Sequence, residues 1–167
     1  MSRLLATALL FFSLVWVGPA LAKPPASTPE ERAKAVRLAR ELEANPMSAD
    51  AAEMRSWLIR WYTRVPDITI KVCDLLGPFP KDDHPFFSEV LTQSMFSGGA
   101  FMIEHPEQSN DQVAVQTAGM IGVLKVYEAF VKVSPDKRLP FLDRLLKRRD
   151  EGTLAAYMPA AVEKGCK

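Results

Sequence analysis

Residues 109–133 have the sequence SNDQVAVQTAGMIGVLKVYEAFVKV, which predicts the longest helix of the chain. Ser109 followed three residues later by Gln112 matches a capping box, in which the two side chains satisfy free backbone amides at a helix start. Apolar residues then recur at helical spacing and define one face of the helix. They are Val113, Met120, Leu124, Tyr127 and Val131, with Gln116 or Thr117 completing the face. We therefore expect a helix that runs to about Val133.

Glycines interrupt this helix and the helix predicted before it. Gly119 and Gly122 lie within residues 109–133, whereas Gly98 and Gly99 lie in a helix that begins near Pro85. Each glycine costs a helix about 1 kcal/mol relative to alanine, so a packing role is expected at these positions. We predict that the two pairs lie near one another where the helices meet. Glycines that face solvent would contradict this prediction.

Cap signals predict further helices on both sides of this pair. Thr28, Pro29 and Glu31 combine an N-cap hydroxyl, a proline at the first helical position and a capping-box carboxylate. Ser48 is the cap expected for the next helix, and Ser134 precedes a proline in the same way as Thr28. The predicted helices span approximately residues 29–44, 48–64, 67–77, 85–105, 109–133, 134–151 and 153–163.

Residues 67–77 are the ambiguous part of this pattern. The alternation from Ile68 to Val72 is typical of a strand, but no other segment alternates convincingly, so a strand here would lack a partner. We therefore expect a short helix, capped by Asp67 and ended by Gly77 and Pro78. The whole pattern predicts an all-α fold, a single-domain bundle of about six to seven helices in residues 29–167.

The first 22 residues have the organisation of a cleavable signal peptide. One cation, Arg3, precedes an apolar run from Leu4 to Val17, and Gly18 and Pro19 stand before the small-x-small triplet at residues 20–22. An uncleaved membrane anchor is the alternative, but it needs about 20 apolar residues, more than this run supplies. We expect cleavage, a flexible lead-in at residues 23–28, and a secreted or periplasmic protein with no transmembrane segment.

The two cysteines, Cys73 and Cys166, both follow the predicted cleavage site. An even cysteine count in an oxidising compartment predicts a disulfide, and two cysteines allow one intramolecular pairing. The alternatives are a redox-active thiol and an intermolecular bridge, but the chain has no Cys-x-x-Cys motif. The bridge would fasten the C-terminal residues to the middle of the chain.

Charge gives no reason to expect a nucleic acid or an anionic membrane as partner. The chain has 21 Lys and Arg against 20 Asp and Glu, and cleavage would remove Arg3 and balance the two. The one basic cluster, Lys147 to Arg149, stands near a predicted helix end, where it complements the helix dipole.

The two histidines, His84 and His105, each precede a proline at a predicted helix boundary. A turn residue with a local hydrogen bond is the simpler interpretation. The alternative is a metal-dependent or hydrolytic enzyme that uses His84 with Asp82 and Asp83, or His105 with Glu104. Because a straight helix would separate the histidines by about 30 Å, they cannot share one metal.

Five residues are candidates for ligand binding. Trp57 and Trp61, one helical turn apart, could form a stacking platform, although such a regular apolar stripe is more typical of a core. Met95, Met102 and His105 have spacings that would suit a cuprous ion, although methionine on an apolar helix face is ordinarily core filler. We assign no metal or other cofactor from the sequence.

No catalytic motif is present, so the sequence nominates no catalytic residue and favours a non-enzymatic protein. We expect an exported binding or structural protein of the cell envelope or extracellular space. The alternatives are a carrier of a small apolar ligand between helices, suggested by the abundance of Phe, Met and Trp, and the histidine enzyme. An enclosed apolar cavity would favour the carrier. The partner could be a protein or a small apolar ligand.

Overall fold

Six α-helices and two short 3₁₀ turns follow one another in the computed structural model, which describes residues 25–78 and 84–167. The helices are α1 (Pro29–Ala44), α2 (Ala51–Arg64), α3 (Phe87–Glu104), α4 (Gln112–Val133), α5 (Pro140–Asp150) and α6 (Leu154–Gly165). The described residues contain no strand, so the all-α prediction is confirmed. The signal peptide predicted at residues 1–22 lies outside the described residues, as do Asp82 and Asp83.

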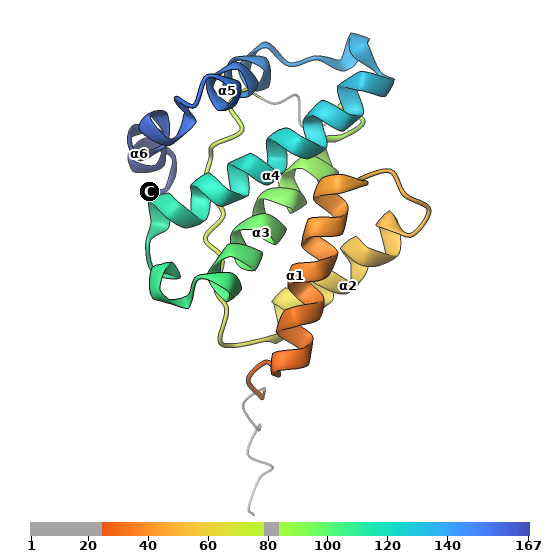
Figure 1. The fold of residues 1–167 in the computed structure, drawn as a ribbon, viewed down its shortest axis with the longest axis vertical. Helices are drawn as coiled ribbons and strands as arrows, with labels where there is room; N and C mark the ends of the chain where they lie inside the picture. The colour runs from red at the N-terminus through yellow and green to blue at the C-terminus, as the bar shows by residue number, and fades with distance from the viewer. Residues whose placement is uncertain (1–24, 79–83) are drawn as a thin grey trace, which may run out of the picture.

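The antiparallel pair α3 and α4 forms the centre of the molecule (Figure 1). One buried cluster joins α1 and α2 to the C-terminal half of α3 through side chains such as Leu42, Trp61 and Phe96. A second cluster joins α4, α5 and α6 through side chains such as Tyr127 and Leu142. The first residues of α3 belong to the second cluster, so one helix contributes to both.

The glycines bring α3 and α4 into direct contact, as predicted. A Cβ on Gly119 would lie 2.7 Å from the backbone oxygen of Ser94, and one on Gly122 would lie 1.9 Å from Ser97 Oγ. Gly98 also faces α4, where a Cβ would lie 3.4 Å from Val115. Gly99 differs from the prediction because it packs against Tyr62 of α2 rather than against α4.

The N-cap of α1 agrees with the prediction, whereas that of α4 differs from it. The Thr28 capping box is confirmed, since Glu31 N donates to Thr28 Oγ1 over 3.2 Å and Thr28 N donates to the Glu31 carboxylate over 3.1 Å. The cap predicted at Ser109 is wrong: Asp111 accepts from the amides of Val113 and Ala114 instead. A carboxylate is at least as good an N-cap as a hydroxyl, and it stands directly before the first helical residue.

Three other helix boundaries differ from the prediction. Ser48 does not cap α2, because its hydroxyl is buried without a hydrogen-bond partner and the helix begins at Ala51. The proline after Ser134 opens a 3₁₀ turn, and α5 begins only at Pro140. The last helix continues to Gly165.

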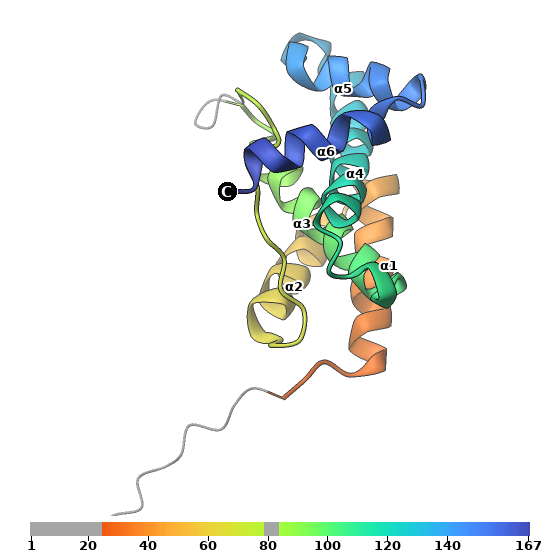
Figure 2. The same ribbon diagram turned by 90° about the vertical axis from the view of Figure 1, so that its left-hand side faces the viewer.

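The short helix predicted at residues 67–77 is wrong, and no strand replaces it. Residues 65–78, here called the crossing segment, are extended and pass from the first cluster, which holds Ile68, to the second, which holds Leu75 and Leu76 (Figure 2). A helix advances about 1.5 Å per residue and an extended chain about 3.3 Å, so an extended segment spans about twice the distance that a helix of the same length would. Its Lys71 carbonyl accepts a 2.7 Å hydrogen bond from Gln116 of α4.

The lead-in is attached to the start of the crossing segment at Asp67. The Ser27 hydroxyl and amide donate to the Asp67 carboxylate over 2.7 and 3.0 Å, and Arg32 forms an ion pair with it. These hydrogen bonds lower the pKa of Asp67 from its usual 3.8 to about 2. The flexibility expected for residues 23–28 as a whole stays a prediction.

Candidate binding cavity

The disulfide predicted between Cys73 and Cys166 is confirmed, with the two Sγ atoms 2.08 Å apart. It joins the crossing segment to the end of α6 across 93 residues of sequence. Beside it, Asp74 N donates to the Gly165 carbonyl over 3.0 Å, and Lys71 Nζ donates to the Cys166 carbonyl. A Cβ on Gly165 would lie 2.5 Å from the Asp74 backbone oxygen, so this close approach requires glycine.

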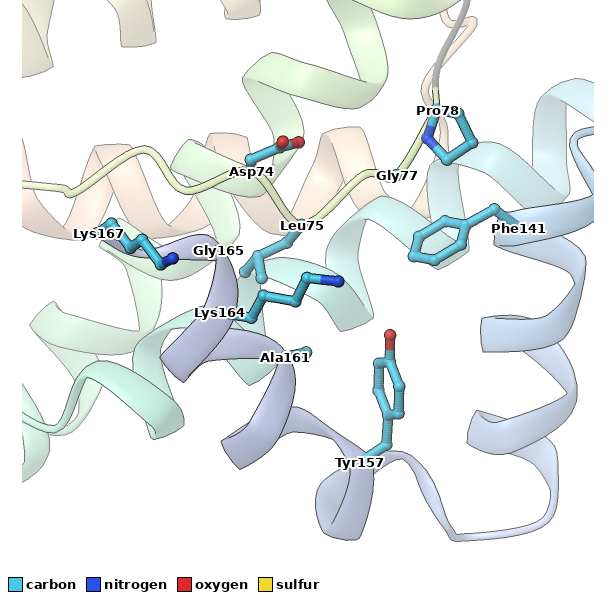
Figure 3. Close-up of a pocket in the computed structure, with 10 residues that line it drawn as sticks. All are labelled: Asp74, Leu75, Gly77, Pro78, Phe141, Tyr157, Ala161, Lys164, Gly165 and Lys167. Carbon is cyan, nitrogen blue, oxygen red and sulfur yellow. The ribbon is translucent and has the colours of Figure 1, made fainter.

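A cavity of about 600 Å³ lies directly beside this attachment, between the crossing segment, α5 and α6 (Figure 3). Its apolar wall consists of Leu75, Pro78, Phe141 and Ala161. The Phe141 ring stacks closely on Gly77, where a Cβ would lie 2.6 Å from the ring and where φ is +67°. The Tyr157 hydroxyl and the Lys164 ammonium point into the same space from α6 (Figure 3).

Positive charge dominates the surroundings of the cavity. Lys164 and Lys167 line it, Arg148 lies over the Tyr157 ring at 4.7 Å, and Arg144 lies over the Phe141 ring at 5.7 Å. Within the described residues, no carboxylate forms an ion pair with any of these four cations. The lining also contains one acidic side chain, Asp74, which is exposed, as are Lys164 and Lys167.

The sequence contained one signal for this site. Tyr157, Ala161 and Lys164 have spacings of four and three residues, which places them on one face of α6. These residues could not be assigned to a site from the sequence, because a cavity exists only where this face meets the crossing segment, for which the sequence pattern predicts a helix.

The tryptophans predicted as candidate ligand residues lie in the opposite half of the molecule. Trp57 and Trp61 stack with ring centroids 5.7 Å apart, and Trp61 is only 2 % exposed in the first cluster. Lys34 lies 4.4 Å over the Trp57 ring. A hollow of about 290 Å³ borders both tryptophans and Arg60. The packing of Trp61 agrees with a core role, while binding at Trp57 stays a prediction.

Met95, Met102 and His105 occupy different environments. Both methionines pack against the first cluster, whereas His105 ends α3 and is exposed, with its ring 4.6 Å from that of Phe101. Its Nδ1 lies 3.6 Å from the Glu107 carboxylate. In the part of the chain that the structure describes, no three His, Cys, Asp or Glu side chains are close enough to hold a metal ion.

His84 has the turn role that its position predicted. Its Nε2 lies 2.9 Å from the Lys137 carbonyl, and its Nδ1 accepts from Phe86 N over 3.4 Å. Since Nδ1 accepts, Nε2 carries the proton and donates to Lys137. The residue therefore joins the start of α3 to the turn before α5.

A buried polar cluster that the sequence pattern did not predict lies at the meeting point of α1, α3 and α4. The Glu43 side chain is 3 % exposed, forms a 2.6 Å ion pair with Lys125, and accepts a 2.8 Å hydrogen bond from Ser97 Oγ. Arg40 bridges Glu43 to Glu104, and Gln93 donates to Ser97 and to the Ala39 carbonyl. The signal was a glutamate four residues after Ala39 on the apolar face of α1.

No activity can be assigned to the protein from similarity to known proteins. Comparisons with protein families, with curated proteins and with solved structures found no match. Among residues 25–78 and 84–167, no helix is both long and apolar enough to cross a lipid bilayer.

Proposed function

We propose that the protein is a non-enzymatic binding protein that holds a small molecule with an apolar body in the cavity between α5, α6 and the crossing segment. The observation that supports this proposal is a 600 Å³ space with an apolar wall and two convergent polar groups, Tyr157 and Lys164. Small-molecule sites commonly have about 300–1,000 Å³ and this combination of walls. The cavity opens to solvent, which gives a ligand a path of entry.

This proposal keeps the carrier function but changes the place of the ligand. The alternative raised by the sequence was an apolar ligand held between helices, but Gly119 and Gly122 leave no room for a side chain between α3 and α4. The end of α6 is instead held by a covalent bond at Cys166, beside open space.

We also propose that the protein acts outside the reducing cytosol, in a periplasm or an extracellular space. The Cys73–Cys166 disulfide supports this, because such bonds persist mainly in oxidising compartments. Mass spectrometry of protein from its own host should show a mature chain that starts near Lys23 and has no free thiol. Two free thiols would contradict the proposed compartment.

Binding is tested with a neutral probe of simple shape, 1-decanol, by isothermal titration calorimetry. Ala161→Phe should fill the cavity and abolish binding, since Ala161 lines it. Ala160→Phe is the matched control, because Ala160 is exposed and outside the lining. Decanol that fails to bind the parent protein, or that binds the Ala161→Phe variant equally well, would refute the site.

A further inference from the structure

Half of the eight lysines that the structure describes have a carboxylate partner. Lys125, Lys132, Lys137 and Lys147 each lie within ion-pair distance of Asp or Glu, at 2.6, 3.5, 3.1 and 3.6 Å. Of the other four, Lys34 lies over the Trp57 ring and Lys71 donates to the Cys166 carbonyl. The two that line the cavity, Lys164 and Lys167, form no ion pair, side-chain hydrogen bond or ring contact among the described residues. The two lysines that border the cavity therefore carry positive charge that no described side chain compensates.

The side chains beside Lys164 strengthen this effect. Figure 3 shows its ammonium group and the Tyr157 hydroxyl directed toward the same part of the space. Arg148 lies over the Tyr157 ring, 4.7 Å from its centroid, so a second positive charge lies against the side chain that carries the hydroxyl. A hydroxyl donor and an ammonium donor on one side of a cavity are complementary to an oxyanion.

The apolar part of the lining has different chemistry and comes from the crossing segment, α5 and α6. Leu75 belongs to the second buried cluster, and Phe141 and Ala161 pack against that cluster with part of their surface free. A ligand that contacts both the polar groups and the apolar side chains of the lining therefore needs a charged end and an apolar body.

We propose that the ligand is an amphipathic anion, with a carboxylate or another small oxyanion joined to an apolar chain or ring. Its oxyanion binds between Lys164 and Tyr157, and its apolar body lies against Leu75, Phe141 and Ala161. Lys167, Arg144 and Arg148 add attraction without direct contact. This inference rests on the binding function proposed above and adds the chemical class of the ligand and the residues that select it.

The test compares decanoate with 1-decanol, which share a chain and differ in charge, in calorimetric titrations of the full-length protein. Decanoate should bind the parent protein at least tenfold more tightly. Lys164→Met should weaken decanoate binding about five- to tenfold and Tyr157→Phe about two- to fivefold, while decanol binding stays unchanged. Lys132→Met is the matched control, because it removes the same charge from an exposed position on α4.

The outcomes separate the two proposals. If decanol and decanoate bind equally and Lys164→Met changes neither, the anionic ligand is refuted and the binding function stands. If neither probe binds, the binding function itself fails. Sedimentation with phosphatidylglycerol vesicles distinguishes a free anion from a lipid headgroup: capture that requires Lys164, without decanoate binding, would overturn the proposal. No capture, with decanoate bound, supports it.

Discussion

The junction of α1, α3 and α4 and the cavity beside α6 are built in opposite ways. At the junction, Gly119 brings one helix against the backbone of another, and the buried Glu43 carboxylate is fully paired. Beside α6, a 600 Å³ space remains, Lys164 has no carboxylate partner, and a disulfide holds the walls. The first region therefore holds the helices together, and the second contains the open space on which the proposed binding function depends.

Of the changes considered, removal of the disulfide should cause the largest loss of stability. The double substitution Cys73→Ser and Cys166→Ser opens a loop of 93 residues, and loop-closure entropy predicts a loss of about 4 to 5 kcal/mol in the free energy of unfolding. Urea denaturation measures this loss. We expect the remaining protein to keep the junction and to lose decanoate binding. A loss below about 1 kcal/mol would show that packing, rather than the bond, holds the end of α6.

Enlarging a junction glycine should have the next largest effect. Gly119→Ala places a Cβ 2.7 Å from the Ser94 backbone oxygen, so α3 and α4 must separate, at a cost of about 1 to 3 kcal/mol. Gly98→Ala is the control, because its Cβ would make an ordinary 3.4 Å contact while alanine favours the helix by about 1 kcal/mol. The same unfolding midpoint for both variants would contradict the claim that the contact at Gly119 has no room for a Cβ.

Neutralising the buried Glu43 carboxylate tests how much the buried polar cluster of the junction contributes to stability. Glu43→Gln keeps the shape but weakens the contacts to Lys125, Arg40 and Ser97, and should cost about 1 to 3 kcal/mol. Glu41→Gln, at an exposed position of the same helix, should change stability by less than about 0.5 kcal/mol. Equal stability of the two variants would mean that the Glu43 cluster does not fix the helices.

The smallest effect on stability is expected from a change at Asp67, which lies outside both the junction and the cavity. Its pKa falls from 3.8 to about 2 on folding, chiefly through the hydrogen bonds from Ser27. Its contribution to stability is therefore complete above about pH 4 and is lost as the pH falls through 2. The stability difference between the parent protein and Asp67→Asn should accordingly shrink over this window, as thermal denaturation at several pH values will show. A difference that does not change with pH would contradict the shifted pKa.

The sequence predicted the elements that depend on local signals. The bounds of α1 follow from the Thr28 capping box and from Asn45 and Pro46, which lie within a few residues of its ends. The buried glycines of α3 and α4 were predictable because four glycines in two helices require a packing explanation.

What the sequence did not predict depends on partners far along the chain. The crossing segment is extended because Cys166, Gly165 and Gln116 bind it, and none of these lies near it in sequence. The cavity depends in turn on that segment, so Tyr157 and Lys164 could be placed on one face of α6 but not beside an open space.

The most direct test of the contrast is a titration of the ¹⁵N-labelled protein with decanoate, followed by backbone amide chemical shifts. We predict that the largest changes occur at Leu75, Tyr157, Ala161 and Lys164, and that Glu43 and Ser97 at the junction do not change. Shifts centred on the hollow beside Trp57 and Trp61, or spread over the junction, would contradict the assignment of the cavity as the binding site.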